Sequence, residues 1–461
     1  MKKFNFHCYI IALLAVLSGC SKYLDVKPET SVLADEAYNT ESGFMEHLNG
    51  IYLTMADQKN YGGTTNMVVM ELLGQRYYQG TGGVNAPFKT VASFSYDDSK
   101  TQGYMSAIWS GGYTMIANLN LILDQIDRRK DVFTGNNYRL VKGQALALRT
   151  FLYFDLLRTF GPVYKSADST QYAIPYYSSY SKTPKDYMRA NNFMDSLLRD
   201  NEIARKLLVT PDSTTAFNKK MNYYAATTLQ ARMFLYRGNK PDAFACAKEV
   251  IQAQPALYPF NGSKPTDAAR DPALSGDVVF CIQNQKLINS YNTYFSYVIP
   301  VDWRILYPKD DRLNLCYENN SGDVRMSTAI WNTAPDGSYS FKLFFKYAKG
   351  TMVPVIRASE CYLIAAETSP DMASGWTYLN TIREARNAMA GTTGDLQIEI
   401  GKEYAKEFFG EGQLFFYYKR TFAGSIPDCN NSVATAMRNM TAKDYVVPVP
   451  RDELVIHTPG N

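Results

Sequence analysis

The sequence has 461 residues, of which 46% are hydrophobic and 20% charged, and its formal net charge is +4 at pH 7. This length can form two or three ordinary domains or one large helical array. The charge is close to neutral, and no basic run is long enough to follow a phosphate backbone, which argues against nucleic acid as a partner.

The N-terminus has the pattern of a secretion signal. Lys2 and Lys3 precede an apolar run from Tyr9 to Leu17. The run is less than half of the roughly 20 residues that a membrane-spanning helix needs. We therefore expect residues 1–19 to be removed as a signal peptide.

Leu-Ser-Gly-Cys at residues 17–20 is the pattern of a bacterial lipobox. It predicts that Cys20 is acylated and becomes the first residue of the mature chain, which two or more acyl chains would hold stably on a membrane. Ser21 follows the cysteine in place of Asp, which resembles the outer-membrane address of Gram-negative lipoproteins. The alternative is an ordinary secreted protein with a chance cysteine. The signal does not say whether the protein faces the periplasm or the cell exterior.

Apolar side chains recur at helical spacing through the first half of the chain. The spacing predicts helices over residues 41–55, 107–128 and 139–160, with Ser42 as a candidate N-cap of the first. The third segment is apolar on two sides, which indicates a helix packed inside a stack rather than on a surface. It ends at Gly161-Pro162, as the helix-stop signals require.

The second half predicts two helical hairpins and a last helix. The first hairpin covers residues 223–254 and breaks at Gly238-Asn239, and the second covers 355–367 and 373–388. The last helix covers 402–409. In the first hairpin, small residues fall at the relative spacings of a tetratricopeptide repeat: Ala231, Gly238, Ala243 and Pro255. The sequence therefore predicts a mostly α-helical array.

Two stretches do not fit a simple helical stack. Residues 61–104 are rich in Gly, Asn, Tyr and Phe, and residues 255–350 contain the turn pairs Asn261-Gly262 and Asp336-Gly337 with short β-branched or aromatic runs. Long loops in a compact domain are usually functional. The 35 tyrosines of the chain also suit surfaces that bind polar ligands with apolar faces. We therefore expect the ligand site in these stretches.

The sequence gives little support to catalysis or metal binding. Outside the leader there are two histidines, His47 and His457, and HExxH, GxSxG, P-loop and complete GxGxxG motifs are absent. Glu403, Glu407 and Glu411 occur at four-residue steps with lysines nearby, which predicts a salt-bridged, solvated helix face. We predict no enzymatic activity, no metal and no cofactor.

The cysteines beyond the leader and the lipobox are odd in number and contain no close pair. This pattern is neither a disulfide framework nor a zinc site. We expect most of them to act as small buried hydrophobic residues: Cys246, Cys281, Cys316, Cys361 and Cys429.

Several motifs, in the same order, resemble the SusD/RagB family of outer-membrane nutrient-binding lipoproteins. The strongest is GQALALRTFLYFDLLRTFGPV at 143–163, in which Gln144 stands where the family usually has Glu. The others are CSKYLDVKPE from Cys20, LNGIY at 48–52, IWSGGYTMIANLNLIL at 108–123, VIRASECYLIAAET at 355–368, LNTIREARNA at 379–388 and VVPVPRDEL at 446–454. The segment at 407–420 departs from the family, because Leu414, Phe415 and Tyr417 replace its usual Arg, Trp and Asp. The chain is similar to a divergent branch of the family.

The resemblance implies a SusD-like fold: tetratricopeptide-like helix pairs in an α-solenoid, with a loop-rich, partly β irregular face. It implies one domain over 20–461, made of an N-terminal part (20–210) and a C-terminal part (211–461) with an irregular region at about 255–350. It further implies a SusC-like TonB-dependent transporter as partner and a lipid-anchored position on the outer membrane, facing the cell exterior. The matching residues are structural in nature, and we expect Arg357 and Glu360, one helical turn apart, to pair.

The leading hypothesis is that the protein captures glycans and delivers them to the transporter. Sugar rings pack on aromatic faces, while their hydroxyls take hydrogen bonds from amides and charged groups in a concave, loop-built site. We predict that the ligand-binding residues come from the two irregular stretches: Arg76, Tyr77, Tyr78, Asn85, Phe88 and Tyr96, with Tyr294, Trp303 and Trp331.

Two alternatives remain open from the sequence. The same lid-type protein could capture peptides, as the RagB branch does, mostly through backbone hydrogen bonds rather than stacked aromatic rings. It could also be a lipid-anchored scaffold that binds only proteins through its helical array.

Overall fold

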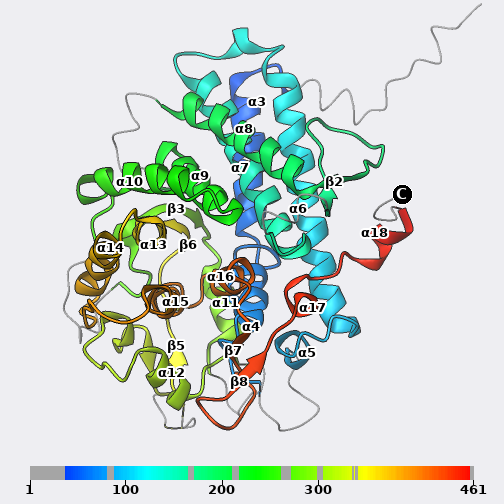
Figure 1. Cartoon of the computed structure of the whole chain (residues 1–461). Helices are drawn as coiled ribbons and strands as arrows, with labels where there is room; N and C mark the ends of the chain where they lie inside the picture. Colours follow the sequence, from blue (N-terminus) through cyan, green and yellow to red (C-terminus); the bar gives the residue numbers. More distant parts are fainter. Residues whose placement is uncertain are drawn as a thin grey trace, which may run out of the picture.

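The computed structural model describes residues 37–79, 88–164, 171–209, 218–260, 271–297, 305–334, 337 and 341–456. Within these ranges helices dominate, and every sheet has two strands. Figure 1 shows two bodies of helices in contact, with β5 (Leu343–Phe344), β7 (Ser425–Pro427), β8 (Met437–Asn439) and adjoining loops toward the lower edge. This is the mostly helical fold with a partly β irregular face that the sequence predicts. The leader, Cys20, Asn85, Trp303 and His457 lie outside the described residues.

The N-terminal body contains four long helices: α3 (Glu41–Ala56), α6 (Ser99–Ile126), α7 (Asn137–Phe160) and α8 (Ala190–Leu208). Helix α7 packs against α3, α6 and α8, so it is buried on nearly all sides, as its two apolar faces predict. Helix α8, which the spacing analysis did not predict, lies against α7 through residues such as Phe193 and Leu197.

Local capping chemistry fixes where these helices begin. The N-cap of α3 is Thr40, whose hydroxyl accepts a hydrogen bond from the Gly43 amide at 3.1 Å, so the expectation for Ser42 is wrong. The Ser42 hydroxyl instead donates to Glu46 at 2.9 Å. Helix α6 begins eight residues before the predicted start because Asp98 accepts hydrogen bonds from the first free amides.

The C-terminal body consists mainly of α9 (Tyr223–Arg237), α10 (Lys240–Leu257), α13 (Ala358–Thr368), α14 (Met372–Ala385), α15 (Leu396–Glu407) and α16 (Leu414–Thr421). Gly238 ends α9 at a φ of 85°, a left-handed conformation that glycine adopts without strain. Helix α10 then folds back on α9 and also packs against α13. The predicted hairpin and its break are confirmed.

One predicted helical segment begins as a strand. Val355–Arg357 belong to β6 (Met352–Arg357), which pairs antiparallel with β3 (Val278–Gln283), and helix α13 starts only at Ala358. The β-branched residues of this run pack well on a pleated strand. Arg357 closes the strand and pairs with Asp277, Glu407 and Glu411, so the predicted Arg357–Glu360 pair does not form. Glu360 instead binds Arg232 of α9 at 2.5 Å.

The shorter elements connect and flank the two bodies. They are a π-helical turn at Thr64–Val69, α4 (Met70–Leu73), α5 (Lys89–Ala92), β1 (Tyr172–Pro175), β2 (Tyr187–Arg189), α11 (Leu287–Tyr294), α12 (Asp310–Cys316), β4 (Trp331–Asn332), β5 (Leu343–Phe344), β7 (Ser425–Pro427), β8 (Met437–Asn439), α17 (Ala442–Tyr445) and α18 (Arg451–Ile456).

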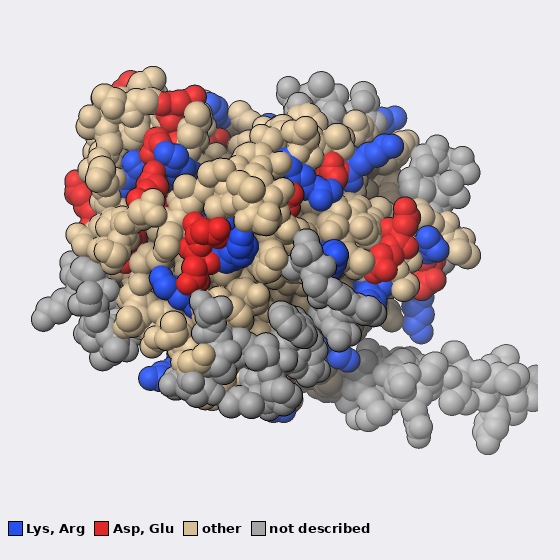
Figure 2. Space-filling view, turned by 90° about the horizontal axis from the view of Figure 1, so that it is seen from below, with Lys and Arg blue, Asp and Glu red and all other residues tan. Residues whose placement is uncertain are grey.

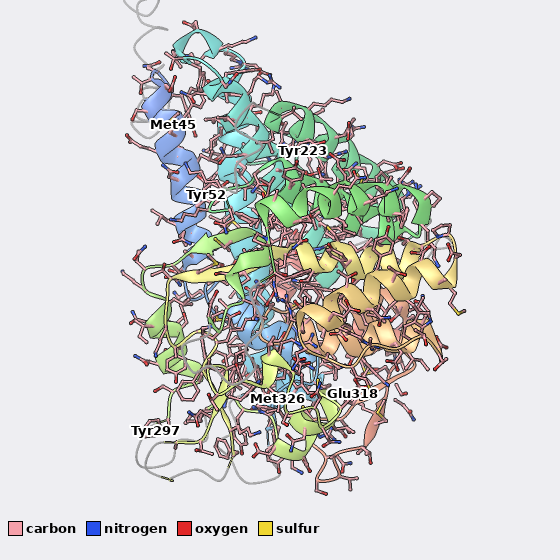
Figure 3. The ribbon with its side chains drawn as sticks, turned by 90° about the vertical axis from the view of Figure 1, so that its left-hand side faces the viewer. Met45, Tyr52, Tyr223, Tyr297, Glu318 and Met326 are labelled. Carbon is pink, nitrogen blue, oxygen red and sulfur yellow. The ribbon has the colours of Figure 1, made fainter. Side chains whose placement is uncertain are left out.

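One hydrophobic core extends from Tyr38 to Val447 and contains residues of both bodies. Tyr52 of α3, visible in Figure 3, ties two segments to this core. Its hydroxyl donates to Gln144 at 2.9 Å and accepts from the Met221 amide at 2.9 Å. Gln144 thus serves as a neutral hydrogen-bond acceptor for Tyr52. All five described cysteines are free, and four of them are buried, as expected.

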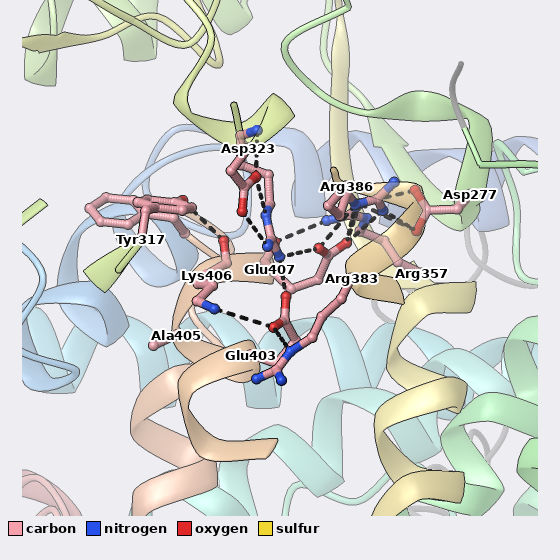
Figure 4. A network of polar contacts seen from close by, with 12 residues as sticks. Asp277, Tyr317, Asp323, Arg357, Arg383, Arg386, Glu403, Ala405, Lys406 and Glu407 are labelled. Carbon is pink, nitrogen blue, oxygen red and sulfur yellow. Dashed lines mark hydrogen bonds and ion pairs between the residues drawn. The ribbon is translucent and has the colours of Figure 1, made fainter. Parts of the chain in front are cut away.

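The glutamates of α15 and the following loop do not form a solvated face. Glu403, Glu407 and Glu411 are at most 3% exposed. They belong to a buried ion network, and Figure 4 shows its part around Glu403 and Glu407. Arg357 and Arg386 approach one oxygen of Glu407 at 2.8 and 2.6 Å, and Arg325 approaches Glu403 at 2.6 Å. The expectation from spacing is wrong because four-residue steps specify a common face but not whether that face meets solvent.

The network changes how these carboxyl groups titrate. Burial by itself raises the pKa of Glu403, but the charges of Arg325, Lys406 and Arg383 outweigh it and lower the pKa to about 2. The pKa of Glu407 is lowered as well, by Arg386 and Arg357 against burial. Both groups therefore stay ionised inside the fold at neutral pH.

These lowered pKa values predict acid sensitivity. Glu403 contributes its stabilisation fully above its unfolded pKa of about 4.3, and loses it as the pH falls toward 2, an effect of about 3 kcal/mol. Urea unfolding between pH 6 and about 2 should therefore give a falling free energy. Glu403→Gln should start lower and fall less steeply, while the exposed control Glu384→Gln keeps the parent slope. Equal slopes for all three proteins would contradict the assignment.

Candidate functional site

Two of the predicted ligand residues are part of the core. Tyr77 is 0% and Trp331 is 2% exposed. The Tyr77 ring lies 5.9 Å from both Phe295 and Phe409, and Trp331 packs on Phe409 at 4.9 Å while its indole N–H donates to the Arg325 carbonyl at 3.0 Å. A ligand could not stack on either ring in this structure.

Arg76 also faces inward. Its guanidinium lies 3.9 Å from the centre of the Phe409 ring and 3.6 Å from the Glu71 carboxylate. Glu71 in turn accepts hydrogen bonds from the amides of Gly410 and Gly412 at 2.9 and 2.7 Å. This group holds the loop after α15 against α4 and contributes to the framework beneath the site.

Phe88, Tyr96 and Tyr294 fasten loops to helices. Phe88 is 5% exposed and packs 6.2 Å from Tyr294, whose hydroxyl lies 3.0 Å from the Thr64 hydroxyl. The Tyr96 hydroxyl donates to the Asp444 carbonyl at 2.7 Å, and burial raises its pKa. The predicted residues are therefore dispersed over several parts of the fold.

Tyr78 is the predicted residue that lies among other half-buried aromatic rings. Its amide donates to the Tyr307 carbonyl at 2.8 Å, and the two rings meet edge to face at 6.2 Å. Tyr307 stacks on Phe341 with the ring centres 3.5 Å apart and the planes 7° from parallel. We call Tyr78, Tyr307 and Phe341 the loop-face aromatic cluster.

Polar and charged side chains surround this cluster, and their arrangement does not resemble that of a catalytic site. The Lys309 ammonium lies 5.7 Å from the Tyr78 ring centre and 3.3 Å from Asp311, and Asp310 accepts a hydrogen bond from the Lys342 amide at 3.0 Å. Seen from below, this side of the molecule carries charges of both signs interspersed among uncharged residues (Figure 2). Within the described ranges, acidic, histidine and cysteine side chains form no group that could hold a metal ion.

Tyr307 and Phe341 were not predicted individually, although both lie in the second irregular stretch. Their partner Tyr78 comes from the first stretch, more than two hundred residues away. The sequence predicted that the ligand site lies in the two irregular stretches. It did not predict which aromatic rings meet, because that depends on tertiary contacts between the two stretches. Figure 3 shows Tyr297 in the same lower loop region, far from Met45 and Tyr52 of α3.

Comparisons with known proteins show which proteins this chain resembles. Residues 22–235 match the model of a SusD-like family described as starch-binding and associating with the outer membrane. The SusD-like protein P2 of Formosa agariphila is 23% identical, and the match covers 99% of this chain and 98% of that protein. The chain is thus similar to SusD-like proteins, over residues 22–235 by the family model and over almost its whole length by this relative.

Solved SusD-like structures share the fold over almost the whole chain. A putative sugar-binding protein from Bacteroides vulgatus superposes with a TM-score of 0.73 and 22% identity, covering 91% of this chain and 97% of its own. The surface glycan-binding protein A of Bacteroides uniformis gives 0.70 and 18%, covering 90% and 98%. In the part of this SusD-like chain that is described, none of the helices combines the length and apolar character needed to span a bilayer.

Because Trp331 is buried, we predict that it stabilises the core and does not bind the ligand. Trp331→Ala should lower the free energy of unfolding by about 3–5 kcal/mol, because a fully buried ring leaves a cavity. Denaturant unfolding measures this loss, and Tyr172→Ala, at a ring that is 42% exposed, is the control that should stay within about 1 kcal/mol. A stability close to that of the parent chain in Trp331→Ala would contradict the core role.

Proposed function

We propose that this SusD-like chain is a cell-surface lipoprotein that binds oligosaccharides on its loop face and passes them to a SusC-like TonB-dependent transporter. The observation that carries the proposal is the loop-face aromatic cluster, in which Tyr78, Tyr307 and Phe341 bring flat rings together from distant segments. The description of the family as starch-binding and outer-membrane associated supports the same ligand class and location.

The chemistry of the cluster suits capture rather than turnover. Aromatic faces pack on the C–H faces of sugar rings, and ammonium and amide groups supply hydrogen bonds to hydroxyls. The Lys309 ammonium stands beside the Tyr78 ring in this way. The carboxylates here are engaged by Lys309 and by the Lys342 amide, so we assign them no acid–base role, and we propose that the protein releases its ligand unchanged.

We further propose that residues 20–461 form one domain, tethered through lipid on Cys20 and facing the cell exterior. The common core from Tyr38 to Val447 supports a single domain. A tethered receptor that hands its ligand to a transporter needs no cofactor.

Calorimetry of the full mature chain against a panel of oligosaccharides tests ligand capture. Tyr78→Ala should weaken binding of the preferred glycan about tenfold, the loss expected from removing a stacked ring. Tyr172→Ala, at an exposed ring of strand β1, is the matched control and should bind as the parent chain does. Absence of heat with every glycan, together with binding of extended peptides, would favour the peptide-binding alternative instead.

Metabolic labelling with radioactive palmitate tests the anchor. The parent chain should carry label and remain with the outer membrane, whereas Cys20→Ala should lose the label and partition into the soluble fraction, since burial of each acyl CH₂ contributes about 0.8 kcal/mol. Detergent extracts of the labelled cells should retain a barrel transporter on the tagged protein. Label on Cys20→Ala, or the same membrane partition for both chains, would contradict the lipobox assignment.

A further inference from the structure

A hollow lies on a different side of the molecule from the loop-face aromatic cluster. It has a volume of about 410 Å³ and is bounded by α6, the loop between β1 and β2, and α18. In Figure 1 these elements lie along the right-hand side, whereas β5 and α12, which flank the loop-face cluster, lie at the bottom. We call this cavity the α6 pocket. Its size falls within the roughly 300–1,000 Å³ range of small-molecule sites.

Aromatic rings form the walls of the α6 pocket. Trp109 packs 4.8 Å from Tyr113, and Tyr113 meets Tyr177 at 6.1 Å with the two planes 84° apart. Tyr180 borders the pocket with 40% of its surface exposed. Two ring planes at nearly a right angle make a corner in which one flat ligand ring can stack on one wall and meet the other edge-on.

Hydrogen bonds fix this corner before any ligand arrives. The Tyr113 hydroxyl donates to the Pro175 carbonyl at 2.8 Å. The Asn120 side-chain amide donates to the carbonyls of Tyr177 and Ser179 at 2.9 and 3.2 Å, and accepts from Arg149 at 2.7 Å. Because Asn120 is 1% exposed, these bonds secure the loop to α6 from within, and a preorganised wall costs less ordering when a ligand binds.

The charges at the α6 pocket favour a neutral ligand. The Lys185 ammonium lies 5.7 Å from the Tyr177 ring centre, which places a positive charge against one wall. Glu453 of α18 lines the opposite part of the pocket. Burial raises the pKa of Tyr177, and the nearby Glu453 carboxylate raises it further against the hydrogen bond from the Lys185 amide. Asp124 of α6 also accepts a hydrogen bond from the Tyr180 amide at 2.8 Å. Charges of both signs therefore border the pocket, and this mixture gives little selective attraction for a charged ligand.

The remaining lining groups can form hydrogen bonds with hydroxyls. Ser110, Thr114 and Ser181 contribute hydroxyl groups around the rings. Tyr177 accepts a hydrogen bond from the Lys185 amide at 3.1 Å, so its own phenol hydrogen remains available to donate. A ligand with apolar ring faces and a rim of hydroxyls matches this combination.

We propose that the α6 pocket is a second binding site, for one or two neutral sugar rings of a glycan, separate from the loop-face cluster. A chain with two such sites can hold different parts of a long glycan, or rebind a released end, because the second contact forms at a raised effective concentration. The site is defined by its own residues and does not depend on the loop-face cluster.

Two-site analysis of sugar binding tests the proposal on the full mature chain. The probes are a panel of α- and β-linked disaccharides of glucose, galactose, mannose and xylose, observed by calorimetry and by ligand saturation-transfer NMR. Tyr180→Ala removes an exposed wall, and Thr114→Trp fills the pocket from α6. Tyr172→Ala is the matched control, because its ring is 42% exposed, against 40% for Tyr180, and does not line the pocket.

We expect at least one disaccharide to lose about tenfold in affinity with Tyr180→Ala and to lose its saturation transfer with Thr114→Trp, while Tyr172→Ala and Tyr78→Ala leave this component unchanged. If no disaccharide binds, or if both pocket variants bind as the parent chain does, the inference is overturned. If Tyr78→Ala alone abolishes binding, the proposed function stands and the α6 pocket fails. If the pocket variants alone reduce binding, the pocket stands and the loop-face cluster fails.

Discussion

The fold depends on a buried ion network centred on Glu407. This carboxylate lies at the end of α15 and is held by Arg357, which closes β6, and by Arg386, which follows α14. Both arginines also reach Asp277 beside β3, at 3.0 and 3.1 Å. Ions buried so deeply are costly unless each is paired and hydrogen-bonded, so the network forms completely or is strongly destabilising. It therefore specifies one arrangement of the strand pair and the C-terminal helices.

The same network extends toward the loop face. Arg357 contacts Glu411 at 3.0 Å, and Glu411 also binds Lys346 at 2.5 Å. The loop that carries Glu411 is fixed a second time by Glu71, which also binds Arg76. Tyr78 follows Arg76 by two residues. Ionic contacts and backbone hydrogen bonds thus connect the interior to the segment that carries Tyr78, which helps half-buried side chains on irregular segments to hold fixed positions.

A different set of contacts holds the walls of the α6 pocket in place. Its walls come from α6, the loop between β1 and β2, and α18, and neutral hydrogen bonds through Asn120 join the helix α6 to the loop. The loop-face cluster, in contrast, joins segments that lie far apart in the sequence. The two surfaces are built independently, so substitutions at one should leave the geometry of the other intact.

Apolar periodicity in the sequence determined the helices α3, α6 and α7, though not α8, and the buried position of α7, since a helix with two apolar faces has few other places to lie. Small residues and a left-handed glycine determined the hairpin at Gly238. Tertiary structure alone decided where Glu403 and Glu407 lie, because charge spacing reports which residues share a face but not what covers it. It also decided that Trp331 packs inward while Tyr78 meets Tyr307, since composition cannot tell which rings of an irregular stretch the core will cover.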